Sequence, residues 1–271
     1  MNPFFINAVI AALLASIASG IIGSYVVVKR IVFISGSIAH SVLGGMGLFL
    51  FLKRKFNLIW LEPIYGAFLA AILSAVLIGW IQLYFRQRKD AVIAAVWSTG
   101  MAIGVIFVSL TPGYNVELMN FLFGNILWIT TRDLYLLACL NILIFFFVAK
   151  YYTQFLIVCF DEEQALLQGV DVGKIYLFLL SLVALSTVLL IEIIGIILVL
   201  ALLTLPPMVA SLFTRRLSSM IFVSIFLATF MNIGGIALSY LANWPMGATI
   251  ALVCAMTYMI ILFLKKKLTF T

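Results

Sequence analysis

Apolar runs of about 20 residues recur along the whole chain and constrain its fold more than any other feature. A run of that length lets an α-helix cross about 30 Å of hydrocarbon. Of the 271 residues, 66% are hydrophobic and 9% are charged, which is more apolar surface than a soluble domain of this size can bury. The sequence therefore predicts an all-α polytopic membrane protein.

Nine runs are long enough to be membrane spans, and the sixth and seventh are separated by only a few residues around Glu192. They cover about residues 4–28, 32–52, 61–85, 91–110, 133–149, 172–191, 193–213, 219–240 and 247–264. The close pair is also consistent with a re-entrant hairpin or one long broken helix. We therefore expect eight or nine transmembrane helices, in a single domain over residues 1–271. We expect the first run to be a retained anchor, since no basic residue precedes it.

The basic residues predict an orientation, because cytoplasmic loops of membrane proteins are enriched in Lys and Arg. With the N-terminus outside, every basic residue falls on the cytoplasmic side except Lys53, Arg54, Lys55 and Arg132. Nine spans then place the C-terminus in the cytoplasm. The net charge of +7 follows from this asymmetry and calls for no nucleic-acid partner.

His40 is the only histidine of the chain and lies inside the second apolar run. A titratable side chain in hydrocarbon is costly and normally faces protein or a polar cavity. Gly36, Ser37, Ser41 and Gly44 lie three or four residues from His40, hence on its helix face, where small residues let another backbone approach. Two interpretations stand: the imidazole takes part in ion passage, or it hydrogen-bonds a neighbouring helix.

Glu192 is the second candidate, between two isoleucines in an otherwise apolar stretch. At the outer turn of a hairpin, its carboxylate would attract a cation toward a path through the membrane. The alternative is an ordinary solvated carboxylate in a turn. Together, His40 and Glu192 would form an incomplete two-ligand metal site.

The chain contains no GxxxxGKS/T phosphate-binding loop, so it hydrolyses no nucleotide by that route. A transport function would then need either an ion gradient or a separate ATPase subunit. The longest cytoplasmic segment, Tyr151 to Lys174, favours a subunit because it is built to form a short exposed helix.

Three acidic residues begin that helix and a glycine ends it, as helix-end preferences expect. The acidic residues are Asp161, Glu162 and Glu163, and the glycine is Gly169. An apolar ridge of Ala165, Leu166 and Leu167 would fit a groove on a partner. An ordinary surface helix between two spans is the alternative.

Five stretches, in order along the chain, resemble one family of membrane proteins. They are FISGSIAHSVLGG (33–45), NVELMNFLFGNIL (115–127), DEEQALLQGV (161–170), LLIEIIGIILVLALLTLPPMVASLFTRR (189–216) and ALSYLANWPMGATIALV (237–253). Together they are similar to permeases of the zinc, manganese and iron importer family of the ATP-binding-cassette type. Five matches in the right order are far more specific than any one of them.

This resemblance implies a type II importer-like permease, not an enzyme, in a bacterial cytoplasmic (inner) membrane. It implies a homodimer served by two cytoplasmic ATPase subunits, which touch the segment at about 155–173, and by an external solute-binding protein. The cargo would be a divalent metal ion, zinc, manganese or iron, with no permanently bound cofactor. His40 would be a metal contact on a helix that lines the path.

The chain departs from the family pattern at Gly36, where many members carry an aspartate four residues before the histidine. A hard Mn²⁺ or Fe²⁺ site favours such an oxygen ligand, whereas imidazole suits Zn²⁺ without selecting it.

Three rival functions fit parts of the pattern. A cobalamin or siderophore permease shares the short coupling helix, but such permeases are longer. A proton-coupled secondary carrier would relay protons through His40 and Glu192 and would work without ATP. An intramembrane enzyme is disfavoured because the sequence has no HExxH and no paired aspartates within the spans.

Overall fold

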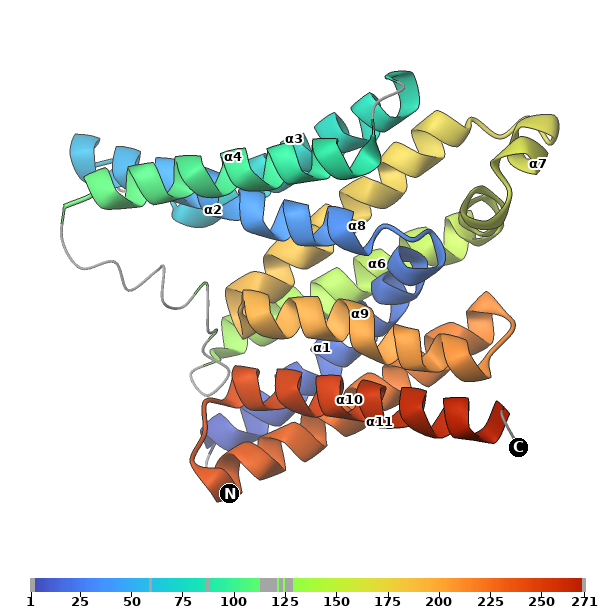
Figure 1. Cartoon of the computed structure of the whole chain (residues 1–271). Helices are drawn as coiled ribbons and strands as arrows, with labels where there is room; N and C mark the ends of the chain where they lie inside the picture. Colours follow the sequence, from blue (N-terminus) through green and yellow to red (C-terminus); the bar gives the residue numbers. More distant parts are fainter. Residues whose placement is uncertain are drawn as a thin grey trace. The chain divides into compact units, whose positions relative to one another are not determined.

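The computed structural model describes residues 3–58, 60–85, 88–112, 121, 124 and 129–269, without the side chains of 3–5, 89 and 266–269. All regular elements within these ranges are helices (Figure 1). Nine of these described helices are long and apolar enough to cross a membrane. The helices are α1 (Pro3–Val28), α2 (Val32–Phe56), α3 (Pro63–Tyr84), α4 (Lys89–Leu110), α6 (Thr131–Phe160), α7 (Glu162–Leu167), α8 (Val172–Ile194), α9 (Ile196–Phe213), α10 (Leu217–Ala242) and α11 (Met246–Thr269). The predicted all-α, polytopic fold is confirmed.

The close pair of apolar runs forms two separate helices, α8 and α9, joined at one residue. That residue is Gly195, whose backbone has φ 81° and ψ 157°. Only glycine adopts this region readily, because a side chain would clash with the backbone there. Each of the two helices is long enough to cross a membrane, so the described part of the chain contains nine candidate spans, in agreement with the nine apolar runs of the sequence.

The fifth run was predicted to end at residue 149, but α6 continues to Phe160 through a local non-helical residue, Tyr151 (φ −108°, ψ 16°). The prediction was wrong because Lys150 ends the apolar run without ending the helix. The added turns have a buried anchor: Phe155 is fully buried, with its ring 5.8 Å from that of Phe178 in α8.

The chain divides into two compact units that interleave along the sequence. The first unit contains Met1–Arg30, Asn120–Ala149 and Leu189–Thr271, and the second contains Ile31–Met119 and Lys150–Val188. In the first, α1 packs against α9 and α10, and α11 packs against the same two helices. In the second, α2 packs against both α3 and α4 (Figure 1).

Asparagine side chains tie the first unit together inside the apolar spans. Asn232 of α10 is 1% exposed, and its Nδ2 donates to Ser16 Oγ at 2.7 Å and to the Ala12 carbonyl at 3.2 Å in α1. Asn141 of α6 donates to the Leu14 carbonyl at 3.0 Å. Such bonds link helices because hydrocarbon offers polar groups no other partner.

Candidate functional site

The small-residue face of α2 lies directly against α4, within the second unit. Ser37 Oγ donates to the backbone carbonyl of Ile93 at 3.0 Å. Farther along, a β-carbon on Gly44 would lie 2.7 Å from the carbonyl oxygen of Gly100. The two backbones therefore touch, as small residues on a helix face predict, and the partner helix is α4 of the same chain.

All four residues that the sequence proposes as path-lining are buried in α2. Ser41 donates to its own helix, at the Ile38 carbonyl, at 2.8 Å, and its backbone meets Gly100. Ser37, Ser41 and Gly44 thus form the α4-facing surface of α2, and Gly36 is buried one turn before His40. Their lining of an ion path stays a prediction.

The His40 side chain is half-buried and stacks on Trp97 of α4. The ring centroids are 4.4 Å apart and the ring planes differ by 12°. Within the described part of the chain, no residue hydrogen-bonds the His40 imidazole. The structure thus gives no support to the interpretation in which His40 hydrogen-bonds a neighbouring helix.

Trp97 is itself held at its polar edge, because Nε1 donates to Met101 Sδ at 3.1 Å, one turn along α4. The sequence analysis missed both residues. A tryptophan in an apolar run carries no signal of its own, since such residues are ordinary in membrane helices. The available signal was Gly100 and Gly104, a GxxxG spacing that predicts a close helix partner for α4.

Glu192 lies in the last turn of α8 and is exposed. It belongs to the first unit, whereas His40 belongs to the second. A metal site shared by His40 and Glu192 therefore stays a prediction. Among the described residues, no three His, Cys, Asp or Glu side chains gather closely enough to hold a metal ion.

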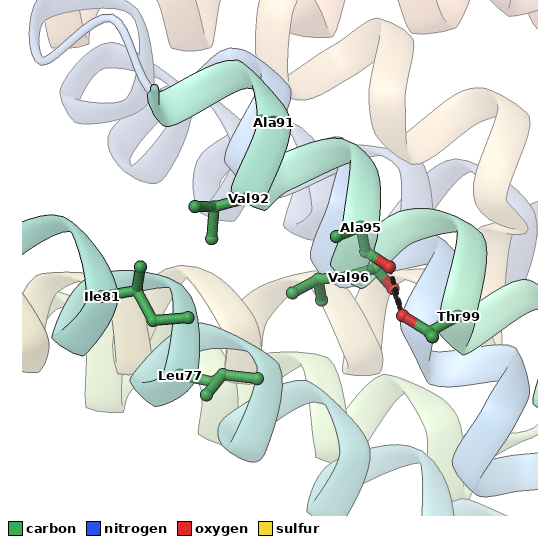
Figure 2. Close-up of a pocket in the computed structure, with 7 residues that line it drawn as sticks. All are labelled: Leu77, Ile81, Ala91, Val92, Ala95, Val96 and Thr99. Atoms are coloured by element: carbon green, nitrogen blue, oxygen red, sulfur yellow. Dashed lines mark hydrogen bonds between the residues drawn. The ribbon is translucent and has the colours of Figure 1, made fainter. Parts of the chain in front are cut away.

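An open groove of about 370 Å³ lies between α3 and α4 (Figure 2). Its lining consists of Leu77, Ile81, Ala91, Val92, Ala95, Val96 and Thr99. The one side-chain oxygen, on Thr99, donates to the Ala95 carbonyl of its own helix, as the dashed line in Figure 2 shows. The groove is apolar and presents no carboxylate, imidazole or thiolate to a cation.

The short cytoplasmic helix forms with the ends that the sequence predicts. Asp161 is the N-cap of α7, and its carboxylate accepts from the Gln164 amide at 2.9 Å. Gly169 follows the helix with φ 75°, and its amide donates to the Leu166 carbonyl at 3.0 Å. The Val170 amide donates to the Ala165 carbonyl at 3.0 Å, which completes a Schellman motif.

The apolar ridge predicted for α7 needs one correction. Ala165 is fully buried within the chain, whereas Leu166 is 62% exposed and Leu167 is 89% exposed. Successive helix residues are rotated by about 100°, so three in a row cannot share one face. The ridge open to a partner therefore consists of Leu166 and Leu167, and it is bordered by the exposed carboxylates of Glu162 and Glu163.

The start of α8, just after this segment, is also fixed locally. Asp171 accepts from the Lys174 amide at 3.0 Å and pairs with the Lys174 ammonium at 2.9 Å. These contacts lower the pKa of the Asp171 carboxyl below its ordinary value. Hydrogen bonds and an ion pair within the segment from Asp161 to Lys174 thus fix its local conformation.

Of the motif between Asn115 and Leu127, only Phe121 and Gly124 belong to the described residues. The other four stretches of the resemblance lie in described helices: α2, α7, α8–α9 and α10–α11.

Comparisons with known proteins support the resemblance. Residues 1–265 match the model of the ABC 3 transport family. A "Probable metal transport system membrane protein" of Chlamydia trachomatis is 45% identical, over 97% of this chain and 90% of that protein. The "Manganese transport system membrane protein MntC" of Listeria innocua is 31% identical, over 97% of this chain and 95% of that protein.

A solved structure agrees with these matches. The chain resembles PsaBC from Streptococcus pneumoniae, determined in complex with Fab, with a TM-score of 0.82 and 27% identity, over 96% of this chain and 91% of that one. The match to the family model covers nearly the whole sequence, so it includes every candidate residue considered above. The chain therefore belongs to the ABC 3 transport family, as a multi-pass membrane permease and not an enzyme.

Proposed function

We propose that the chain is the permease of an ATP-driven importer of divalent metal ions, in a bacterial cytoplasmic membrane. It acts as one domain over residues 1–271 and forms the path as a homodimer. Two cytoplasmic ATP-binding subunits supply the energy, and an external solute-binding protein delivers the metal. Membership of the ABC 3 transport family supports an ATPase partner, and the printed names of the Chlamydia and Listeria relatives support a metal cargo.

One observation carries the proposal: the only histidine of the chain lies in a membrane span with both ring nitrogens unbonded to any described residue. An imidazole in a span is costly unless it has a function. Neutral imidazole is also a common ligand for transition metals. We assign His40 to contact the passing ion on the α2 helix, where Gly36, Ser37, Ser41 and Gly44 form the wall of the path.

A sparse site suits transport. An ion held by a complete, closed ligand set would leave slowly, whereas one or two imidazoles bind weakly enough to release it. A second copy of the chain would bring a second His40 to the dimer axis. A nitrogen-only donor set suits zinc better than manganese, while the Listeria relative is named for manganese.

Glu192 acts at the outer entrance in this proposal. It is exposed at the end of α8, three residues before the Gly195 break. With the N-terminus outside, the α8–α9 junction faces the exterior. A carboxylate at that rim raises the local concentration of cations before they enter the path.

The segment at about 155–173 couples transport to the ATPase. The exposed Leu166 and Leu167 dock into an apolar groove of that subunit. The two cap motifs, at Asp161 and Gly169, fix the orientation of this helix so that it transmits motion to α8.

The decisive test is uptake by the chain reconstituted in vesicles with its ATPase and solute-binding protein. We expect ATP-dependent uptake of Zn²⁺, Mn²⁺ or Fe²⁺, and a strong loss in His40→Ala. Ser35→Ala is the matched control, because that α2 hydroxyl only bonds its own helix, at the Val32 carbonyl. Uptake driven by a proton gradient without the ATPase would instead identify a secondary carrier. Unchanged uptake in His40→Ala would remove that residue from the path.

A further inference from the structure

We propose that Trp97 is a positioning residue for metal passage: its indole, fixed by Met101, holds the His40 imidazole in the plane from which it contacts the ion. The inference rests on the proposed role of His40. It adds Trp97, from α4, to the candidate residues that the sequence proposes, His40 with its α2 helix face and Glu192.

The geometry of the stack leaves the ligand atoms open. The imidazole and indole rings lie face to face, 4.4 Å between centroids and 12° from parallel. The lone pair of an imidazole nitrogen lies in the ring plane, so a metal approaches the ring at its edge. Trp97 therefore covers one face of His40 without blocking coordination, and it restricts rotation of the ring about the Cβ–Cγ bond.

The indole of Trp97 can hold the imidazole because contacts before and after Trp97 along α4 fix the position of the indole. Its Nε1 donates to Met101 Sδ at 3.1 Å. One turn before Trp97, the Ile93 carbonyl accepts from Ser37 at 3.0 Å. About one turn after it, Gly100 touches the α2 backbone. Trp97 thus sits between two fixed contacts of α4 with α2, and its position relative to His40 follows from them.

The stack also favours the loaded state of the site. The face of an indole carries negative potential and attracts cations. An imidazole that binds a divalent metal gains positive charge, and that charge then lies over the indole face. Trp97 should therefore lower the KM for the metal and have little effect on the maximal rate.

The full reconstituted transporter tests this inference through the KM for Zn²⁺ and for Mn²⁺. We expect Trp97→Leu to raise the KM by about threefold to tenfold, the range that loss of an aromatic pair implies, with little change in kcat. Trp97→Phe keeps an aromatic face and should restore most of the affinity. Met101→Leu frees the indole edge and should lie between wild type and Trp97→Leu.

Phe107→Leu is the matched control. The Phe107 ring of α4 lies 5.4 Å from the Phe51 ring of α2, so this change removes an aromatic contact between the same two helices without touching His40. The control should leave the KM unchanged. An equal rise in KM for Phe107→Leu and Trp97→Leu would overturn the proposal, because general α2–α4 packing would then explain both.

A spectroscopic signature separates positioning from packing. Since the chain has one histidine, isotope-labelled histidine in the full-length permease reports on His40 alone. Stacking should shift its ring-proton resonances upfield in the wild type, and Trp97→Leu should abolish that shift. Wild-type resonances at ordinary histidine positions would overturn the stack, whatever the variants do.

Different results would overturn the proposed role of His40 and the inference about Trp97. If His40→Ala retains the wild-type KM, the metal contact at His40 fails and the inference about Trp97 falls with it. If His40→Ala impairs uptake while Trp97→Leu does not change the KM, only the inference about Trp97 is overturned.

Discussion

Gly44 of α2 lies so close to Gly100 of α4 that a β-carbon on Gly44 would meet the Gly100 carbonyl oxygen at 2.7 Å. Real β-carbons essentially never approach a heavy atom that closely, and a backbone carbonyl cannot rotate away as a flexible side chain can. On another side of α2, a β-carbon on Gly45 would clash with the Gly66 carbonyl oxygen of α3. Adjacent glycines of α2 therefore let α3 and α4 approach it from two directions.

Gly44→Ala should force α2 and α4 apart. An added methyl group in a well-packed contact typically costs about 1–3 kcal/mol. Because His40 and Trp97 stack across the same pair of helices, uptake should fall as well. Thermal unfolding of the purified permease in detergent measures the first effect, and metal uptake in vesicles measures the second.

Gly234→Ala is the control for this prediction. Gly234 also lies in a span, in α10, but a β-carbon there would meet no other described part of the chain within 4 Å, its own helix backbone aside. Replacement of a helix glycine by alanine normally stabilises the helix by up to about 1 kcal/mol. Equal losses of Tm in the two variants would show that the α2–α4 contact is not limiting.

The features that sequence reasoning predicted correctly are local. Nine spans follow from run length and hydropathy, and the ends of α7 follow from Asp161 and Gly169. Each of these signals lies within a few residues of the feature that it specifies. The break between α8 and α9 is local as well, but it lies at Gly195, three residues after the Glu192 around which the sequence analysis placed it.

Sequence reasoning could not predict the features that depend on which helices pack against each other. The apolar run of α4 does not specify that Trp97 faces His40, because both helices are hydrophobic on most sides. Their alignment comes from particular contacts, such as Ser37 with Ile93. The burial of Ala165 was predictable in principle from the helical period, but which side of α7 faces the chain was not.

Asn232 provides a test of polar links within the membrane. Asn232→Leu removes the bonds to Ser16 and Ala12 and should cost about 1 kcal/mol, because such bonds are individually weak in membrane proteins. The substitution also removes Asn232 Oδ1, which is buried with no hydrogen-bond partner among the described residues. Removal of that unpaired oxygen offsets part of the loss.

Asn232→Asp should lower the Tm more than Asn232→Leu does, although aspartate is closer in shape to asparagine. The Ala12 carbonyl can only accept, so it would repel the new carboxylate, and Ser16 could donate to that carboxylate only by giving up its own bond to Ala12 at 2.7 Å. A buried carboxylate in a span costs about 3 kcal/mol. The order of Tm values should be wild type, Leu, then Asp. A variant with Asp as stable as wild type would contradict the expected cost of a carboxylate at this buried position.

Tyr176 and Gln82 link α8 to α3 within the second unit. Tyr176 Oη donates to Gln82 Oε1 at 2.7 Å, and Gln82 Nε2 is buried with no hydrogen-bond partner in the described ranges. Tyr176→Phe would leave the whole Gln82 amide unpaired, at a cost of about 1–3 kcal/mol. Adding Gln82→Leu to that variant should recover most of the stability, because no polar group then remains unpaired. A double-mutant cycle of unfolding midpoints measures the coupling, and purely additive losses would refute it.

Leu167 tests the coupling surface of α7. Because its side chain is 89% exposed, Leu167→Asp should change the stability of the permease itself by no more than about 0.5 kcal/mol. Binding of the ATPase subunit should nevertheless weaken by about tenfold or more, as loss of an apolar anchor in a partner's groove implies. Gln168→Ser, next in the chain and also exposed, is the matched control and should bind normally. Calorimetry measures the affinity of the purified permease for the ATPase subunit and so distinguishes Leu167→Asp from Gln168→Ser. Equal affinities for the wild type and both variants would place the contact outside the ridge of Leu166 and Leu167.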